Sequence, residues 1–338
     1  MQPVKWILRC GVLDILPSIL KWASPHEGSV AIFLLQRLML SEDGPRLLVQ
    51  PLDTLHKPPI DLLGDFICQH VSEDDISLSP DTVAGVLYLY SKAILDANWA
   101  QPDGIKAQFQ QILDIALDAE DSLVRTWASF ALAACPPPDA EIQRKVRQLA
   151  AADPTQNVRT AASFAIWQWR APEADCANGS LGEEDCDHID FISQASKDAS
   201  YLVRAFAFAL AMDFVLSHQH EVVEYIKQLA VNKDVTANEG NLSPHSSLEP
   251  IISTLVRGCR DPLHFLRKAV QDFLMRLWAD ERICDTDSWG RVFPDMPQVM
   301  NTANPAEKTQ ASDRSSTVSF CSVLSWLVLS HVLISPAP

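Results

Sequence analysis

Apolar residues along the chain recur at intervals of three and four, the spacing that places them on one face of an α-helix. In the first 98 residues this pattern predicts four helices bounded by proline or polar turn residues, at 13–23, 29–40, 59–71 and 80–98. The last two begin with proline, which suits the first turn of a helix because the N–H group that it lacks has no partner there. We interpret residues 1–98 as degenerate helical repeats.

After residue 98 the pattern becomes an explicit repeat. Four amphipathic helices, predicted at 105–117, 140–151, 188–196 and 248–259, are each followed by a short turn and a second helix. Each turn contains an aspartate, and each second helix begins with an aliphatic residue and an arginine. The residue three positions after the arginine is alanine in three occurrences and Val270 in the fourth. The residues that fill this pattern are Asp121, Arg125, Ala128, Asp153, Arg159, Ala162, Asp198, Arg204, Ala207, Asp261 and Arg267. Four occurrences indicate a repeat array.

Each part of the pattern has an expected structural role. The aspartate caps the second helix, the small residue lets two helices approach closely, and the arginine reaches an acidic turn in its own or the adjacent repeat. One helix pair cannot bury its apolar face alone, so neighbouring pairs stack. The sequence therefore predicts an all-α fold, an α-solenoid of stacked antiparallel helix pairs over 99–284, with polar insertions at 171–187 and 232–247.

The C-terminal part of the chain has a different composition. Residues 285–317 are polar and contain prolines, which predicts a flexible linker. In the apolar tail, 318–338, the run 318–334 carries no formal charge but is shorter than the roughly 20 residues of a spanning helix. Three interpretations stay open: an anchor, a packing helix, or an artefactual or truncated end. We expect membrane association only from the first.

Charge and cysteine content narrow the class of protein. The formal net charge of −16 opposes binding to phosphate backbones, and we find no basic face, so we expect protein partners and no nucleic acid. The eight cysteines are scattered through a chain too large to need disulfides, which indicates reduced thiols and a cytoplasmic protein.

Motifs for catalysis are missing from the sequence, which has no nucleophile elbow, Walker loop, dinucleotide fingerprint or zinc-protease motif. We therefore expect no enzyme activity and no cofactor. His218 and His220 are two residues apart and so point to different faces of a helix, which disfavours a shared metal. Cys176, Cys186 and His188 lack the short cysteine spacing of zinc sites. We interpret the tryptophans at helical spacing as core residues.

Two candidate interaction sites lie in the insertions. The first insertion ends in an acidic loop that we predict to be exposed and to contribute to partner binding, formed by Glu183, Glu184, Asp185 and Asp187. Ser243 precedes a proline in the second insertion and is a candidate phosphorylation site.

The segments around the four arginines resemble HEAT and armadillo-type repeats, in which the second helix begins D-x-x-x-V-R-x-x-A. More specifically, the order "VRTWASFALAAC", "NVRTAASFAIWQW", an acidic loop, "YLVRAFAFALAM", a linker and "CRDPLHFLRKAVQDFL" resembles the middle helical-repeat region of the Raptor family, the scaffold subunits of target-of-rapamycin complex one. The linker here is shorter, and the caspase-like domain and propeller of that family have no counterpart.

The Raptor resemblance implies a scaffold that presents substrates to the target-of-rapamycin kinase in nutrient signalling. It also implies contacts with that kinase and with small GTPases, and recruitment to the lysosomal or vacuolar surface. An importin-like transport adaptor and a phosphatase scaffold or regulatory subunit are the alternatives, because such solenoids also present extended surfaces to protein partners.

Overall fold

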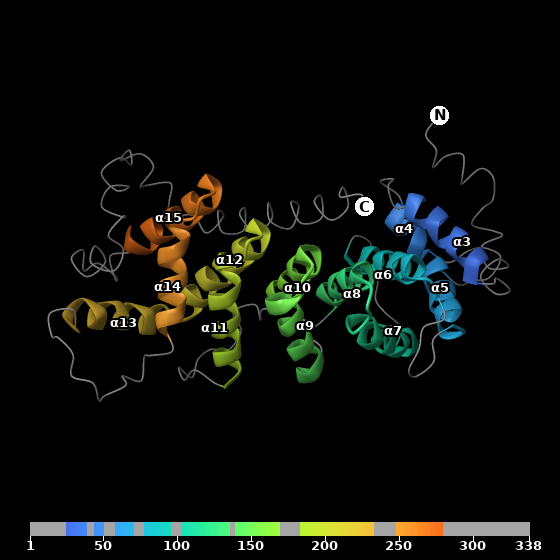
Figure 1. Cartoon of the computed structure of the whole chain (residues 1–338), viewed down its shortest axis with the longest axis horizontal. Coiled ribbons are helices and arrows are strands. Elements are labelled where there is room, and N and C mark those ends of the chain that lie inside the picture. Colours follow the sequence, from blue (N-terminus) through green and yellow to red (C-terminus); the bar gives the residue numbers. More distant parts are fainter. Residues whose placement is uncertain are drawn as a thin grey trace. The chain divides into compact units, whose positions relative to one another are not determined.

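A computed structural model describes residues 25–38, 44–50, 58–70, 78–95, 103–135, 139–169, 183–232 and 248–279. Within these ranges the regular structure consists of thirteen helices and no strand, so the all-α prediction is confirmed (Figure 1). The chain divides into two compact units, Met1–Trp169 and Arg170–Pro338. The predicted helix at 13–23, the linker, the apolar tail and Ser243 lie outside the described residues.

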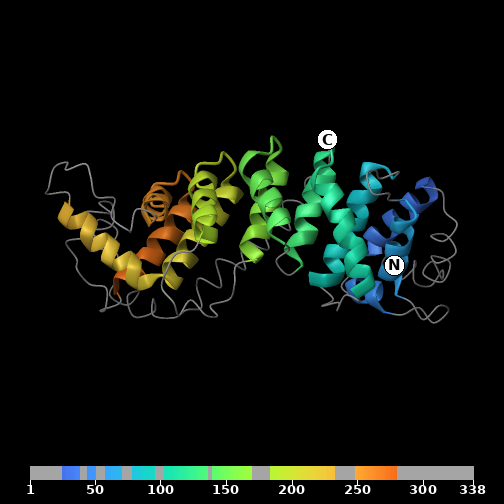
Figure 2. The ribbon, with the colours of Figure 1, turned by 90° about the horizontal axis from the view of Figure 1, so that it is seen from below.

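In the described part of the first unit, helices begin at the predicted residues 59, 80 and 140, whereas the helix predicted at 29–40 begins four residues earlier. The helices are α3 (Pro25–Leu38), α4 (Gly44–Val49), α5 (Pro59–Cys68), α6 (Pro80–Leu95), α7 (Asp103–Leu117), α8 (Ser122–Ala133), α9 (Ala140–Ala152) and α10 (Gln156–Gln168). Helix α8 lies between α6 and α10 and packs against both, and α3 packs on the other side of α6 (Figures 1 and 2). Helix α7 packs against α5, α8 and α9, while α9 also packs against α10. The short helix α4 was not predicted.

Aromatic side chains fill the contacts between these helices. Tyr90 of α6 stacks on Phe109 of α7 with ring centroids 3.7 Å apart, and Phe130 of α8 lies 5.6 Å from Phe164 of α10. Burial raises the pKa of the Tyr90 phenol far above its ordinary value, and the nearby Cys135 thiol adds to this. Because Tyr90 is buried and stacked on Phe109, it is a packing residue in this core.

Trp127, Trp167 and Trp169 lie in the described part of the first unit. Trp167 is buried, Trp127 is half-buried against Tyr88 at 4.9 Å, and the half-buried Trp169 donates its indole N–H to the Leu132 carbonyl at 3.0 Å. All three therefore pack within the helical core, as their spacing predicts. The side chain of Trp278 and the whole of Trp289 lie outside the described residues.

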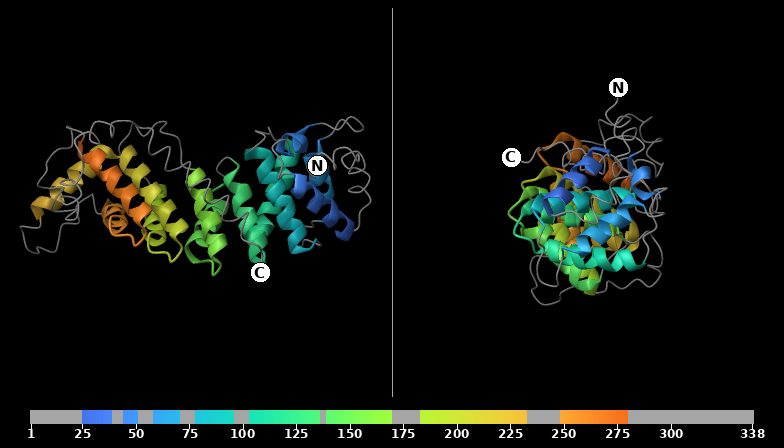
Figure 3. Two further views of the ribbon diagram at one scale, coloured as in Figure 1. Left: turned by 90° about the horizontal axis from the view of Figure 1, so that it is seen from above. Right: turned by 90° about the vertical axis from the view of Figure 1, so that its right-hand side faces the viewer.

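The second unit contains α11 (Glu183–Ala195), α12 (Tyr201–Ser217), α13 (Gln219–Asn232), α14 (Glu249–Gly258) and α15 (His264–Ala279). Helix α14 packs against both α11 and α12, and α15 packs against α12 and α14 (Figure 3). Helix α11 begins at Glu183, five residues earlier than the predicted start at His188. The four residues predicted to form an acidic loop therefore belong to the first turns of a helix, and their side chains lie outside the described part.

Helix α13 is an additional element that the sequence pattern does not predict. It makes an angle of 96° with α12, although neither glycine nor proline occurs at the break (Figure 1). The break is at His218, whose φ of −119° and ψ of 39° are not helical. Its ring stacks on Phe214 with centroids 4.3 Å apart and its Nδ1 lies 3.1 Å from the Phe214 carbonyl oxygen. His218 thus ends α12 and turns the chain into α13.

None of the described helices is, by itself, long and apolar enough to cross a bilayer, whereas α12 together with Gln219–Ile226 has the necessary length and apolar composition only as a pair bent by 96°.

Candidate functional site

Each of the four repeat arginines holds the turn that precedes its own helix. One terminal nitrogen donates to two backbone carbonyl oxygens, located six and five residues earlier. For Arg125 these are the carbonyls of Ala119 at 2.8 Å and Glu120 at 2.7 Å. The other acceptor pairs are Asp153 and Pro154 for Arg159, Asp198 and Ala199 for Arg204, and Asp261 and Pro262 for Arg267. The arginine therefore stabilises the turn locally.

Arg125 and Arg204 also bind an aspartate of the following helix pair. Arg125 donates from Nε to Asp153 Oδ2 at 2.8 Å and from a terminal nitrogen to Oδ1 at 3.3 Å. Arg204 makes the same forked contact with Asp261 at 2.7 and 3.3 Å. The arginine side chains are 12% and 13% exposed and the aspartates only 3% and 2%. We call these two contacts the Arg–Asp junctions; each joins one helix pair to the next within its own unit.

The aspartates do not all have the predicted capping role. Asp121 is the N-cap of α8 and accepts a hydrogen bond from the Leu123 N–H at 2.7 Å. In α10 and α12 the N-cap positions are instead Thr155 and Ser200, neither of which makes a side-chain capping bond. Asp153, Asp198 and Asp261 lie two residues further back, and each accepts from the N–H two residues ahead. Each therefore closes the turn before its helix, so the capping prediction is wrong for Asp153 and Asp198.

The difference in position has a simple cause in the sequence. Asp121 precedes its arginine by four residues, whereas the other three aspartates precede theirs by six. Counted from the arginine, the residue equivalent to Asp153 in the earlier turn is Ala119, whose carbonyl Arg125 holds. Asp121 is thus a separate capping residue, and it does not belong to the series that forms the Arg–Asp junctions.

Small residues are buried at the predicted position of each second helix. Ala128, Ala162 and Ala207 are fully buried, and Val270 fills the same position in α15. A small residue also occurs nine positions before each of the four arginines. It was not predicted, although aligning the four segments on their arginines shows it. These residues are Ala116, Ala150, Ala195 and Gly258, all buried.

Gly258 shows how the fourth pair compensates for its larger residue. A Cβ atom placed on Gly258 would lie 2.8 Å from Val270 Cγ2, closer than real carbon atoms approach. The larger Val270 on α15 is therefore matched by a glycine on α14, and both helices can keep a close contact.

An exposed ion cluster links the first helices of two pairs. Lys145 of α9 lies 2.7 Å from Asp114 of α7 and 2.9 Å from Asp118, the residue directly after α7. Hydrogen bonds to these two carboxylates raise the pKa of the Lys145 amine. The cluster is solvated, so it contributes less to stability than a buried pair would.

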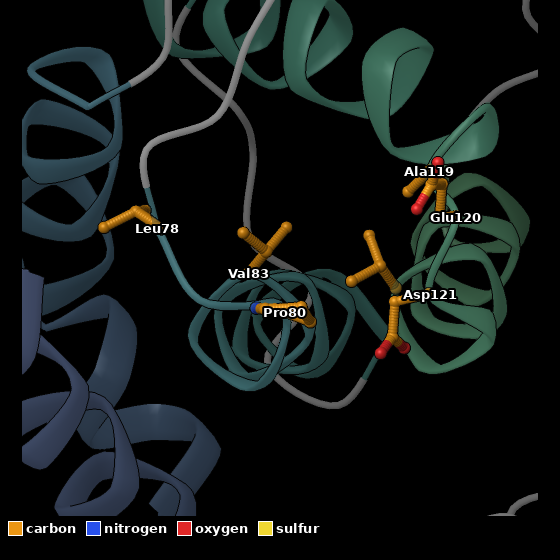
Figure 4. A pocket seen from close by; sticks show the side chains of 7 residues that line it. Leu78, Pro80, Val83, Ala119, Glu120 and Asp121 are labelled. Carbon is orange, nitrogen blue, oxygen red and sulfur yellow. The ribbon is translucent and has the colours of Figure 1, made fainter.

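A groove of about 480 Å³ lies at the beginning of α6 and α8. Figure 4 shows side chains from the two sides of this groove. Its lining residues are Leu78, Pro80, Val83, Ala119, Glu120, Asp121 and Val124. The leucine and the two valines are buried and form an apolar floor, while Pro80 and both acidic residues are exposed. We call this cavity the α6–α8 groove. The same turn thus supplies the carbonyls that Arg125 holds and one wall of the groove.

Among the described residues, no three or more histidine, cysteine, aspartate or glutamate side chains are grouped so that they could hold a metal ion. His220 is exposed. Cys176 and the side chain of Cys186 lie outside the described part.

Comparison of the chain with models of protein families, with curated proteins and with solved structures gives no match.

Proposed function

We propose that this chain is a non-catalytic scaffold for protein–protein interaction, with each unit built as a segment of an α-solenoid. The observation that carries the proposal is the Arg–Asp junction, which is present in both units with the same geometry. A contact that joins each helix pair to the next supports stacking of pairs, and stacked pairs create the extended surfaces that repeat proteins use to bind partners.

The chemistry of the recurring residues supports a structural assignment. Arg125 and Arg204 each use four N–H donations on carbonyls and a carboxylate, and the paired aspartates are almost fully buried. The repeated residues therefore stabilise the framework, and recognition of a partner falls to residues that differ between repeats.

The Raptor resemblance gives the proposal a specific form. By that resemblance the partners are the target-of-rapamycin kinase and small GTPases, and the location is the cytoplasm with recruitment to the lysosomal or vacuolar surface. An acidic solenoid that carries basic cargo is the second candidate, favoured by the net charge of −16.

An affinity purification of the tagged full chain from cells, with quantitative mass spectrometry, tests the scaffold proposal. Enrichment of the target-of-rapamycin kinase over a tag-only control supports the Raptor-like form, and enrichment of transport GTPases with basic cargo supports the second candidate. A purified chain that turns over a substrate, or that enriches no protein over the control, contradicts the scaffold proposal.

A further inference from the structure

We infer that the α6–α8 groove is a docking site for a short peptide segment of a protein partner, carrying one aliphatic side chain next to lysine or arginine. The inference deepens the proposed scaffold function, on which it rests, by naming the chemistry of one partner. It is argued from the shape, the floor and the charge of the groove.

The floor and the size of the groove select an apolar side chain. Leu78, Val83 and Val124 present carbon atoms there and are each less than 10% exposed. A volume of about 480 Å³ falls within the range of about 300–1,000 Å³ that ligand sites occupy. One aliphatic side chain and the backbone on either side of it fit such a space.

The rim selects positive charge. Glu120 and Asp121 line the groove and are exposed, and Asp81 in the first turn of α6 is also exposed, next to the lining residue Pro80. Exposed carboxylates around an apolar floor attract a cation that flanks an aliphatic group.

An anion is the competing occupant, because two helices begin at the groove and helix N-termini attract negative charge. The chain's own groups already satisfy that attraction: Asp121 caps α8, and Asp81 lies in the first turn of α6. The nearest cation of the same turn, Arg125, is bound to Asp153 and to two carbonyls. The net field at the rim therefore favours a basic segment.

Binding of synthetic peptides to the full chain, followed by fluorescence anisotropy, tests this inference. The probe is a fluorescein-labelled Gly-Gly-Lys-Leu-Lys-Gly-Gly peptide, compared with versions that replace both lysines with glutamate or the leucine with glycine. We expect a dissociation constant of about 0.1–1 mM for the first peptide, and at least about tenfold weaker binding for the glutamate version. Equal binding of the three peptides, or no saturable binding of the first, overturns the inference.

Variants of the chain locate the binding. Glu120→Lys reverses one rim charge and keeps the backbone carbonyl that Arg125 holds, so the affinity should fall by about threefold to tenfold. The matched control is Asp190→Lys on the exposed face of α11, which should change the affinity by less than about twofold. Equal losses in both variants would show attraction by overall charge and would overturn the assignment to the groove.

A second pair of variants changes space without changing charge. Ala119→Leu places a larger side chain in the groove and should weaken the first peptide, whereas Ala152→Leu at an exposed position of α9 should not. Thermal unfolding of each variant checks that the fold is kept. If these variants alter nothing while the full chain still captures partners from cells, the groove inference fails and the scaffold proposal survives. If the full chain captures no partner at all, the scaffold proposal itself fails.

Discussion

The two Arg–Asp junctions have the same geometry but bridge very different lengths of chain. Arg125 and Asp153 are 28 residues apart, whereas Arg204 and Asp261 are 57 apart, with α13 and the second polar insertion between them. The contacts nevertheless agree to within about 0.1 Å in both donor–acceptor distances. The junction is therefore determined by the faces of the packed helices, and the chain between two pairs can be lengthened without changing it.

The largest expected effect comes from removing the buried aspartates. Asp153→Ala and Asp261→Ala each leave a poorly exposed guanidinium without its carboxylate, which costs about 3 kcal/mol or more of unfolding free energy. Urea unfolding of both variants measures the loss. If the two junctions are equivalent, the two losses agree within about 1 kcal/mol.

A conservative substitution separates charge from shape at the same positions. Asp153→Asn and Asp261→Asn keep an acceptor for the turn N–H groups and should cost less than the alanine variants. If Asp261→Ala lowers the unfolding free energy much less than Asp153→Ala does, the two junctions are not equivalent. The junction that bridges the longer stretch of chain would then be the weaker one.

Packing of the small residues gives the next effect. Ala162→Leu adds bulk at a fully buried position of α10 and should reduce stability by about 1–3 kcal/mol. The measurement is the free energy of unfolding, with Gln168→Leu at an exposed position of the same helix as the control. An unchanged stability for Ala162→Leu would refute the role of this position in close packing.

The glycine–valine pair of the second unit allows a test by double-mutant cycle. Gly258→Ala alone should cost about 1–3 kcal/mol, because the new methyl group meets Val270 at 2.8 Å. Val270→Ala removes both Cγ atoms and leaves Cβ, at 3.3 Å, as the atom of that side chain nearest to the new methyl group. Since alanine is intrinsically better in a helix by about 1 kcal/mol, Gly258→Ala should then become neutral or stabilising. Additive effects of the two substitutions would contradict the compensation.

Helix capping predicts a smaller difference inside the first unit. Asp121→Ala removes the cap of α8 and should cost about 1 kcal/mol. Thr155→Ala at the corresponding cap of α10 removes no capping bond and should stay within about 0.5 kcal/mol. Equal losses for the two variants would show that Thr155 has a role beyond the observed contacts.

The smallest effect is expected at the exposed cluster. Lys145→Met should cost less than about 1 kcal/mol, since the carboxylates of Asp114 and Asp118 are largely solvated. Because the folded state raises the Lys145 pKa, this contribution is fully present below the unfolded value of about 10.4 and is lost as the pH rises through the raised value. The unfolding free energies of the unchanged chain and of Lys145→Met, measured from neutral to alkaline pH, should therefore converge at alkaline pH.

The sequence predicted the helices well where periodicity is strong and failed where local signals are absent. The repeated spacing of Asp, Arg and Ala predicted α8, α10, α12 and α15, because these residues recur where a turn leads into the second helix of each pair. Helix α13 was missed because the break at His218 has no glycine or proline to mark where one helix ends and the next begins.

The sites show a similar division. The repeat arginines could be identified from their spacing, but their partners could not, since a partner 57 residues away is chosen by packing. Asp121 was grouped with Asp153 because both precede an arginine, and only the geometry separates the capping residue from the junction residue. The α6–α8 groove had no motif, since its walls come from segments about 40 residues apart that only the fold brings together.

The double task of each junction arginine has a consequence for the order of folding. The contacts to the turn carbonyls span only five or six residues, so they form locally and orient the guanidinium before its distant carboxylate arrives. To form the junction, the chain must then close a loop between the arginine and its aspartate, of 28 residues for Arg125 and 57 residues for Arg204. Doubling the loop adds about 0.6 kcal/mol of closure entropy. The junction of the first unit should therefore close earlier during refolding, and the second should set the slower rate.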